Sequence, residues 1–460
     1  MSMRYLPFAD AASDELPLGR LLRLALFQVS VGMAMVLTTG ILNRVMIVEM
    51  GVASWLVALM VALPLAVAPF RALVGFRSDT HKSAFGWRRV PYIWFGSMFQ
   101  FGGLAIMPFA LIILSGDTHG PAWLGHVSAA LAFLLTGAGL HTTQTAGLAL
   151  ATDLAPPERR SRVVALLYLT LLVGMVGSAL VFSALLKDFS QLRLIQVIQG
   201  AALVTIVINS IALWKQEGRR PQRDPEAPVD FRQAWTQFAA QPGTRRFLVA
   251  VALGTAAFSM QDVLLEPFGA QVLGMTVGAT TLLTALFAAG SVVAFAMAAR
   301  WLGRNRDPHR LAALGLLTGI AAFSAIVFAA PLELPLLFWG GTAFIGVGAG
   351  LFSVSMLVIA MGLDHRDCAG MVIGAWGAVQ AVAMGIGVAL GGTIRDLVSK
   401  LATSGLLGEA MNDVSAGYIV VYHLEIALLF ATLIAIGPLV RSLNTQQDSR
   451  RQFGLAGLPG

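Results

Sequence analysis

Long apolar stretches separated by short polar breaks dominate the chain. Each stretch is about as long as the ~20 residues that cross the hydrocarbon core of a bilayer as a helix. None alternates with period two, and an unpaired backbone amide is costly in lipid, so helices are expected rather than a closed barrel. The twelve predicted spans are 24–46, 54–76, 91–114, 125–150, 163–186, 194–214, 247–268, 277–299, 311–330, 335–361, 371–394 and 418–439. The pattern predicts an all-α membrane protein.

Composition agrees with lipid as the solvent. Of the 460 residues, 57% are hydrophobic and 12% are charged, whereas soluble globular proteins carry about 25% charged residues. The first residues, MSMRYLPFADAASDELPLGRLLR, lack the apolar core and cleavage site of a signal peptide, so we expect a retained cytoplasmic tail. The single cysteine, Cys368, cannot form an internal disulfide, and no metal or redox role is expected for it.

The distribution of basic residues predicts the orientation. An even number of spans places both termini on one side, and 26 of the 31 Lys and Arg residues fall in segments on that side. By the positive-inside rule this side is the cytoplasm. The net charge of +7 therefore reflects topology and contact with anionic membrane lipid, and we expect no nucleic-acid partner.

A long polar insert, rich in Pro and charge, divides the spans into two sets of six. The loops also echo each other between the sets, since 75–89 corresponds to 303–310 and 153–162 to 364–370. Six-span repeats are typical of transporter folds, with the functional site at the interface between repeats. The predicted parts are an N-terminal tail 1–20, a first bundle 21–214, a linker 215–246, a second bundle 247–440 and a C-terminal tail 441–460.

Several motifs resemble known families. The loop GFRSDTHKSAFGWRR and the later Glu-Arg-Arg run are similar to the cytoplasmic-loop signature of the major facilitator superfamily. The stretches LNRVMIVEMGV, PFRALVGFRSDTHKSAFGWRRVPYIW and QDVLLEPFGAQVLGM resemble the PucC/LhaA family of photosynthetic-bacterial antenna assembly proteins, a branch of that superfamily. The likeness extends over nearly the whole chain, from Leu6 to Leu439.

This resemblance implies a fold, a function and partners. The expected fold is two six-helix bundles, and the expected function is delivery of bacteriochlorophyll to newly inserted light-harvesting antenna polypeptides in the bacterial inner, intracytoplasmic photosynthetic membrane. Carotenoid is a further implied pigment, and pigment-synthesis enzymes and a second copy of the chain are further implied partners. A proton-coupled secondary transporter and a pigment-free scaffold stay open as alternatives. No Walker loop, nucleophile elbow, Cys cluster or facing pair of catalytic carboxylates is found, so no enzyme is expected.

Two carboxylates in the seventh span are the most conspicuous candidates for function. Asp262 lies ~22 Å into a hydrocarbon core ~30 Å thick, at 1.5 Å per residue. Glu266 is one turn further on and shares its helix face. Pro267 follows and favours a kink or a helix end there. Ionisable groups within a span usually face the bundle interior or a wet cavity.

The repeat suggests a partner for these acids. Arg44 in the first span falls at almost the same depth as Glu266. We expect either an ion pair of Arg44 with Glu266 or Asp262 that closes the outer side between the halves, or three groups solvated singly among the headgroups. Arg71 either snorkels to the surface or enters the central cavity. Glu425, in the twelfth span, is either protonated or paired inside the bundle.

Two further sets of residues follow from the loops and from the pigment. Asp79 is expected to form a cytoplasmic latch with Arg88 or Arg89, whereas Glu158 and Arg159 either join it or only set topology. A chlorin magnesium needs one axial ligand, which a His, an amide or water can supply. The candidates are His141 and Gln144, three apart on one helix face, and His423, for which hydrogen bonding within the bundle is the favoured alternative. The glycine runs GGTAFIGVGAG and GVALGG are expected to allow close helix packing.

Overall fold

Helices make up nearly all of the ordered secondary structure. The computed structural model describes residues 16–66, 87, 89–115, 121–156, 160–217, 243–302, 307–362, 369–408 and 413–453. Among these residues there is no strand. Eleven helices are long and apolar enough to cross a membrane, and a shorter apolar helix, Ser54–Leu65, begins where the second predicted span begins. The prediction of an all-α membrane protein is confirmed.

The helices follow the predicted spans closely. Residues 16–217, called the N-half below, form α1 (Leu18–Met35), η3 (Val36–Leu42), η4 (Val45–Glu49), α2 (Ser54–Ala66), α4 (Val90–Leu114), α5 (Ala122–Leu154), α6 (Arg160–Leu185) and α7 (Gln191–Leu213). Residues 243–453, the C-half, form α9 (Thr244–Ser259), η6 (Met260–Val263), α10 (Leu265–Gln271), α11 (Val277–Leu302), α12 (Pro308–Ala329), α13 (Pro335–Gly362), α14 (Ala369–Thr403) and α15 (Ala416–Phe453).

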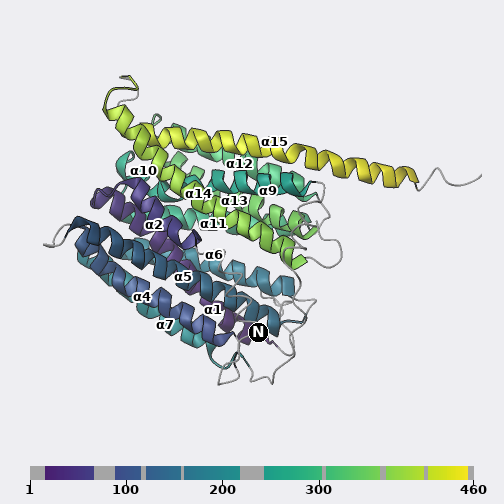
Figure 1. Cartoon of the computed structure of the whole chain (residues 1–460), viewed down its shortest axis with the longest axis horizontal. Coiled ribbons are helices and arrows are strands. Elements are labelled where there is room, and N and C mark those ends of the chain that lie inside the picture. Colours follow the sequence, from purple (N-terminus) through teal and green to yellow (C-terminus); the bar gives the residue numbers. More distant parts are fainter. Residues whose placement is uncertain are drawn as a thin grey trace, which may run out of the picture.

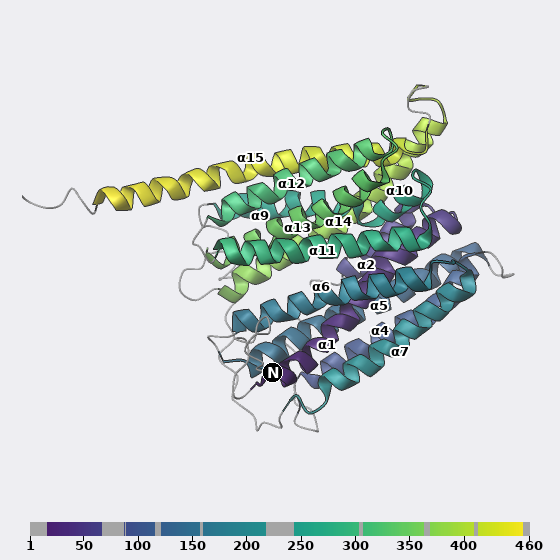
Figure 2. The same ribbon diagram turned by 180° about the vertical axis from the view of Figure 1, so that it is seen from behind.

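Each half packs as a bundle, and the two bundles lie side by side (Figures 1 and 2). In the N-half, α4 packs on α5 while α1 packs on α6 and α7. In the C-half, α13 packs on α11 and α12, and α9 packs on α14 and α15. The halves meet along α2 with α14 and α6 with α11. These two helix pairs form much of the seam between the halves.

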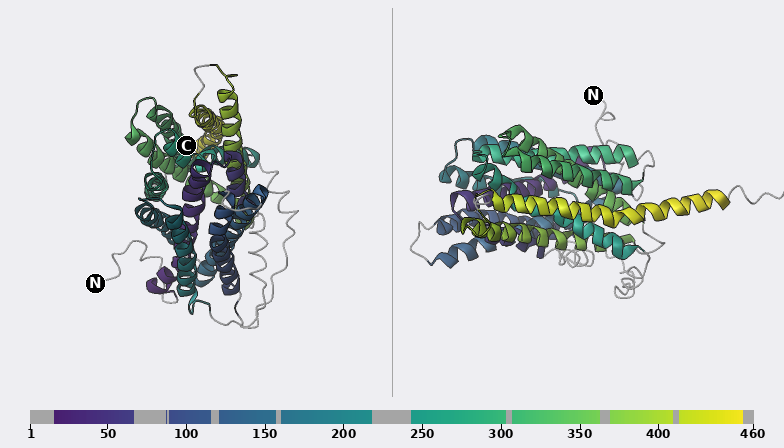
Figure 3. Two further views of the ribbon diagram at one scale, coloured as in Figure 1. Left: turned by 90° about the vertical axis from the view of Figure 1, so that its left-hand side faces the viewer. Right: turned by 90° about the horizontal axis from the view of Figure 1, so that it is seen from above.

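A contact near the start of α1 serves to name the two ends of the molecule. Arg20, near the start of α1, donates from Nη2 to the carbonyl oxygen of Gln216, just after α7, at 2.5 Å. We call this the linker end and the opposite end the distal end. Helix α15 projects past the other helices at the linker end (Figure 3). The sequence predicts that the linker end faces the cytoplasm.

Helices within each half approach closely at glycines. A methyl group at Gly139 of α5 would collide with the backbone of Gln100 in α4. A methyl group at Gly348 of α13 would lie 2.7 Å from the carbonyl oxygen of Gly315 in α12. At the seam, a methyl group at Gly392 of α14 would lie 2.6 Å from the carbonyl oxygen of Ser54. Gly348 and Gly392 belong to the runs GGTAFIGVGAG and GVALGG, for which the predicted role in close helix packing is confirmed.

The first and seventh spans depart from regular α-helical geometry at matching positions of the repeat. In the first span, α1 continues into the π-helical segments η3 and η4. In the seventh span, α9 ends at Ser259 and the 3₁₀ turn η6 precedes α10. The break was expected at Pro267, and that prediction is wrong. Pro267 is the third residue of α10, where a helix needs no amide donor.

Candidate functional site

A cavity of about 240 Å³ lies between the two halves. The N-half contributes α1, η3, α2, α5 and α6 to its wall, and the C-half contributes η6, α10, α11 and α14. Most of the lining is apolar. Its polar residues are Thr38, Thr39, His141, Gln261, Asp262, Glu266 and Thr284. A site at the interface of the repeats, with both acids on its wall, is what the repeat pattern predicts.

The two acids are held by neutral donors. Glu266 is buried, and its Oε1 accepts a hydrogen bond from the Thr284 hydroxyl at 2.9 Å. Its Oε2 accepts from Asn43 Nδ2, across the seam, at 3.4 Å. The same Asn43 amide donates to the backbone carbonyl of Asp262 at 3.3 Å. Gln261 Nε2 donates to Asp262 Oδ1 at 2.6 Å. The N-half thus reaches the acids with an amide group.

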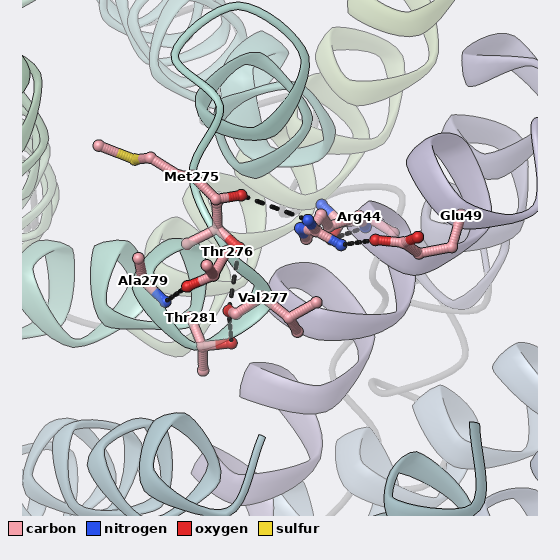
Figure 4. A network of polar contacts seen from close by, with 9 residues as sticks. Arg44, Glu49, Met275, Thr276, Val277, Ala279 and Thr281 are labelled. Atoms are coloured by element: carbon pink, nitrogen blue, oxygen red, sulfur yellow. Dashed lines mark hydrogen bonds and ion pairs between the residues drawn. The ribbon is translucent and has the colours of Figure 1, made fainter. Parts of the chain in front are cut away.

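One of the two expected alternatives, an ion pair of Arg44 with Glu266 or Asp262, is wrong, because Arg44 pairs with Glu49 instead (Figure 4). Arg44 is buried, and its Nη1 lies 2.6 Å from Glu49 Oε1. Its Nη2 donates to the backbone carbonyl of Met275, in the C-half, at 3.4 Å. The π-helical geometry of η4 explains the difference, because a π-helix places residue i+5 next to residue i. Glu49 is the fifth residue after Arg44, and Asn43 faces the acids instead.

A second contact between the halves was not predicted. Asp396 of α14 accepts a hydrogen bond at Oδ2 from the backbone amide of Trp55, in the first turn of α2, at 2.8 Å. Its Oδ1 lies 2.8 Å from Arg395 Nη1. A carboxylate at a helix N-terminus satisfies an amide that has no partner within the helix and complements the helix dipole. Asp396 therefore caps a helix of the other half.

The contacts between the halves gather on the distal side of the cavity. Besides the contacts of Asn43, Arg44 and Asp396, the Ser183 hydroxyl of α6 donates to the carbonyl oxygen of Gly278 in α11 at 2.8 Å. Among the residues that the structure describes, these bonds join the halves at or beyond the level of the two acids. Hydrogen bonds to carboxylates and to backbone carbonyls thus join the two halves on the distal side of the seam.

The three candidate pigment ligands do not lie together. His141 of α5 lines the cavity, and Gln144 is buried on the same helix without lining it. His423 is exposed on α15, with Nδ1 2.8 Å from the carbonyl oxygen of Ile419 in its own helix. The inner face of α15 carries Tyr422 and Glu425, and at ~100° per residue His423 turns away from that face. His423 therefore does not line this cavity, and its contact with Ile419 agrees with the favoured alternative of hydrogen bonding.

Two of the remaining predicted residues, Arg89 and Glu425, lie within the part of the chain whose side chains are described. Arg89 pairs with Asp153 at the end of α5, with Nε 3.1 Å from Oδ2. The backbone amides of Arg89 and Val90 both donate to Glu217 at 3.0 Å, so the start of α4 is fastened to the segment after α7. Glu425 is fully buried. The predicted residues Arg71, Asp79, Arg88, Glu158 and Arg159 lie outside the residues whose side chains the structure describes.

Comparison with known proteins identifies the family. The model of the PUCC protein family matches residues 41–443, which is most of the chain. This protein is a member of the PUCC family. Protein PucC of Rhodovulum sulfidophilum is 56% identical to it over 405 residues, covering 86% of this chain and 89% of the relative. A protein of the puhA-bchM intergenic region of Rhodobacter capsulatus is 55% identical over 445 residues, covering 96% of this chain and 93% of the relative.

Solved structures show the fold of this PUCC protein. A bacterial homologue of the human lysosomal transporter Spinster, in an inward-facing and unoccupied conformation, superposes with a TM-score of 0.67 at 16% identity, covering 91% of this chain and 95% of that one. The predicted fold of the major facilitator superfamily is confirmed. With eleven helices long and apolar enough to cross a membrane, this member of the PUCC family is a multi-pass membrane protein of a photosynthetic bacterial family.

Proposed function

We propose that this protein is an assembly factor for light-harvesting antenna complexes, and that its central cavity holds a bacteriochlorophyll before newly inserted antenna polypeptides receive it. Family membership supports the assembly role. The observation that supports the pigment role is the cavity between the halves, whose described lining is largely apolar and includes one imidazole, that of His141.

The kinds of side chain on the cavity wall support this proposal. Apolar walls with a few converging polar groups are typical of sites for large organic ligands. Phe133, Leu140 and Met175 of the N-half and Phe287 and Met384 of the C-half supply such walls. A bound bacteriochlorophyll would supply a magnesium with one open axial position, and the imidazole of His141 would take that position. The side chains from both halves would hold the ring away from water.

Pigment retention tests this proposal. The protein is purified in mild detergent from a pigment-producing host, and its near-infrared absorption is compared between wild type, His141→Ala and His423→Ala. His423 is a matched control because it is an exposed histidine of a span. We expect the pigment bands to be lost in His141→Ala alone. Equal pigment content in wild type and His141→Ala would refute the assignment of the ligand, and pigment-free wild type would refute the pigment role.

The assembly role has its own test. Deleting the gene in a photosynthetic host is expected to remove an antenna complex while free pigment still accumulates. If the antenna assembles normally without the gene, the assembly role fails. A pigment-free scaffold would assemble antenna unchanged in the Asp262→Asn, Glu266→Gln and His141→Ala variants.

A proton-coupled transporter is the second candidate. Two carboxyl groups on the cavity wall and the transporter fold favour it. A transporter would purify without pigment bands and would sustain uptake of a small molecule into vesicles. The same pigment measurement therefore separates the two functions.

A further inference from the structure

Glu425 is a buried carboxyl group whose two oxygens have no partner at standard hydrogen-bonding geometry among the described residues. It lies on α15, which packs against α9 and against the turn η6, and its side chain is 0% exposed. The backbone of Gln261 is the neighbouring donor, and Asp262 is its charged neighbour. An isolated ionised carboxylate in such a place costs far more free energy than its neutral form.

A second buried group points to the same place. Tyr422 lies one turn before Glu425 on the same face of α15 and is also 0% exposed. Its hydroxyl has no hydrogen-bond partner among the residues described, and its electrostatic neighbours are Glu425, Tyr418 and Glu266. Buried polar groups nearly always have partners. Two buried polar groups without partners, side by side, indicate that a small ligand binds next to them.

The nearby cation is engaged elsewhere. Arg395 donates from Nη2 to the Tyr418 hydroxyl at 3.0 Å and to Gln271 Oε1 at 2.7 Å, and its Nη1 binds Asp396. The guanidinium of Arg395 is thus held by Tyr418, Gln271 and Asp396. A metal ion is not favoured either, because the described residues contain no group of three or more His, Cys, Asp or Glu side chains placed to hold one. The smallest cation, a proton, is the ligand that Glu425 can take.

Asp262 connects this buried position with the cavity. Asp262 is partly exposed and lines the cavity wall, whereas Glu425 lies behind that wall and does not line it. We propose that Glu425 is a proton-binding site of this protein and that Asp262 carries the proton between Glu425 and water in the cavity. The O–H proton of the Glu425 carboxyl group passes to the Asp262 carboxylate through a bridging water molecule, because neither oxygen of Glu425 has a direct hydrogen-bond partner among the described residues. Asp262 then releases it to cavity water.

The consequence is a link between the cavity and the C-half. When Glu425 keeps the proton, its own side chain adds no negative charge beside Asp262. When the proton leaves, a negative charge on Glu425 lies beside the turn η6, which carries Gln261 and Asp262. The occupant of the cavity and the proton on Glu425 thus act on the same turn. The proton-binding role of Glu425 does not depend on pigment being the occupant of the cavity.

Infrared spectroscopy of the full chain in detergent tests this inference. Wild type is expected to show the carbonyl stretch of a protonated carboxyl group at neutral pH. Glu425→Gln is expected to lose that band, Glu425→Asp to shift it, and Glu333→Gln, which changes an exposed glutamate between α12 and α13, to keep it. A band that neither substitution at Glu425 removes or shifts would show that Glu425 does not hold the proton.

The route through Asp262 is tested on the same samples. After transfer into heavy water, the band of Glu425 shifts as deuterium replaces the proton. Asp262→Asn is expected to keep the band and to slow this exchange, whereas Glu333→Gln is expected to leave the rate unchanged. Exchange in Asp262→Asn as fast as in wild type would show that the proton takes another route.

Discussion

Gly40 of η3 allows the first span to approach the Glu266 carboxylate. A methyl group at Gly40 would lie 2.6 Å from Thr284 Oγ1 and 3.6 Å from Glu266 Oε1. To restore an ordinary contact of 3.4 Å, the hydroxyl must move by about 0.8 Å. It then leaves Glu266 Oε1, to which it donates at 2.9 Å. Gly40→Ala is therefore expected to act through this hydrogen bond.

The expected cost follows from the lost bond. A hydrogen bond to a charged group contributes about 1.5–3 kcal/mol, and a neutral one about 0.5–1.5 kcal/mol. Gly40→Ala and Thr284→Ala should each lower the free energy of unfolding by roughly 1–3 kcal/mol. In the double variant, the nearest remaining atom of residue 284 is Cβ, at 3.6 Å. Gly40→Ala should then cost little further, so the two changes should couple by roughly 1–3 kcal/mol.

Denaturant unfolding in mild detergent, followed by tryptophan fluorescence, measures these free energies. Gly102→Ala is the matched control, because a methyl group at that glycine of α4 meets nothing within 4 Å. It should change the free energy by no more than the helix propensity difference of about 1 kcal/mol. If the effects of Gly40→Ala and Thr284→Ala simply add, the close contact between η3 and the Thr284–Glu266 pair is refuted.

Three further substitutions test other contacts. Asp396→Ala should cost about 1 kcal/mol through the lost cap of α2 and should broaden the distribution of distances between spin labels at the exposed positions Ala53 and Lys400. An unchanged distribution would show that the Asp396–Trp55 contact does not hold the halves together at the distal end. The charge exchange Arg44→Glu/Glu49→Arg should restore the antenna assembly that is lost in either single variant, whereas Arg44→Glu/Glu266→Arg should not restore it. Because the Glu49 side chain is 39% exposed, the ion pair itself contributes at most about 1 kcal/mol. Gly139→Ala should lower thermal stability by about 1–3 kcal/mol through overpacking, while Gly177→Ala, which faces open space, should leave the melting temperature unchanged.

The hydrophobic pattern predicted most of the fold, because burial in lipid dictates both the length and the polarity of each span. The bounds of most helices agree within a few residues. The last two spans are longer than predicted. Helix α14 continues to Thr403 because the polar residues after the apolar run are compatible with a helix. The first left-handed glycine after it, Gly405, has φ 75°.

The sequence predicted where the site lies, but it did not predict which contacts the residues of the site make. The repeat and the i, i+4 spacing brought Asp262 and Glu266 to the seam, as the structure shows. The partner was misassigned because an α-helical wheel cannot anticipate the π-helical turns of η3 and η4. Asn43, one residue from the expected Arg44, takes its place. Asp396 carried no sequence signal as a cap, since its partner Trp55 lies 341 residues away in the chain.

That separation along the chain has a consequence for biogenesis. At a translation rate of about 5–20 residues per second, the ribosome needs roughly 20–70 s to synthesise the 341 residues between Trp55 and Asp396. During that interval the first turn of α2 waits in the membrane without the carboxylate that completes it. The nascent first half therefore reaches its finished form only after the eleventh span has been inserted.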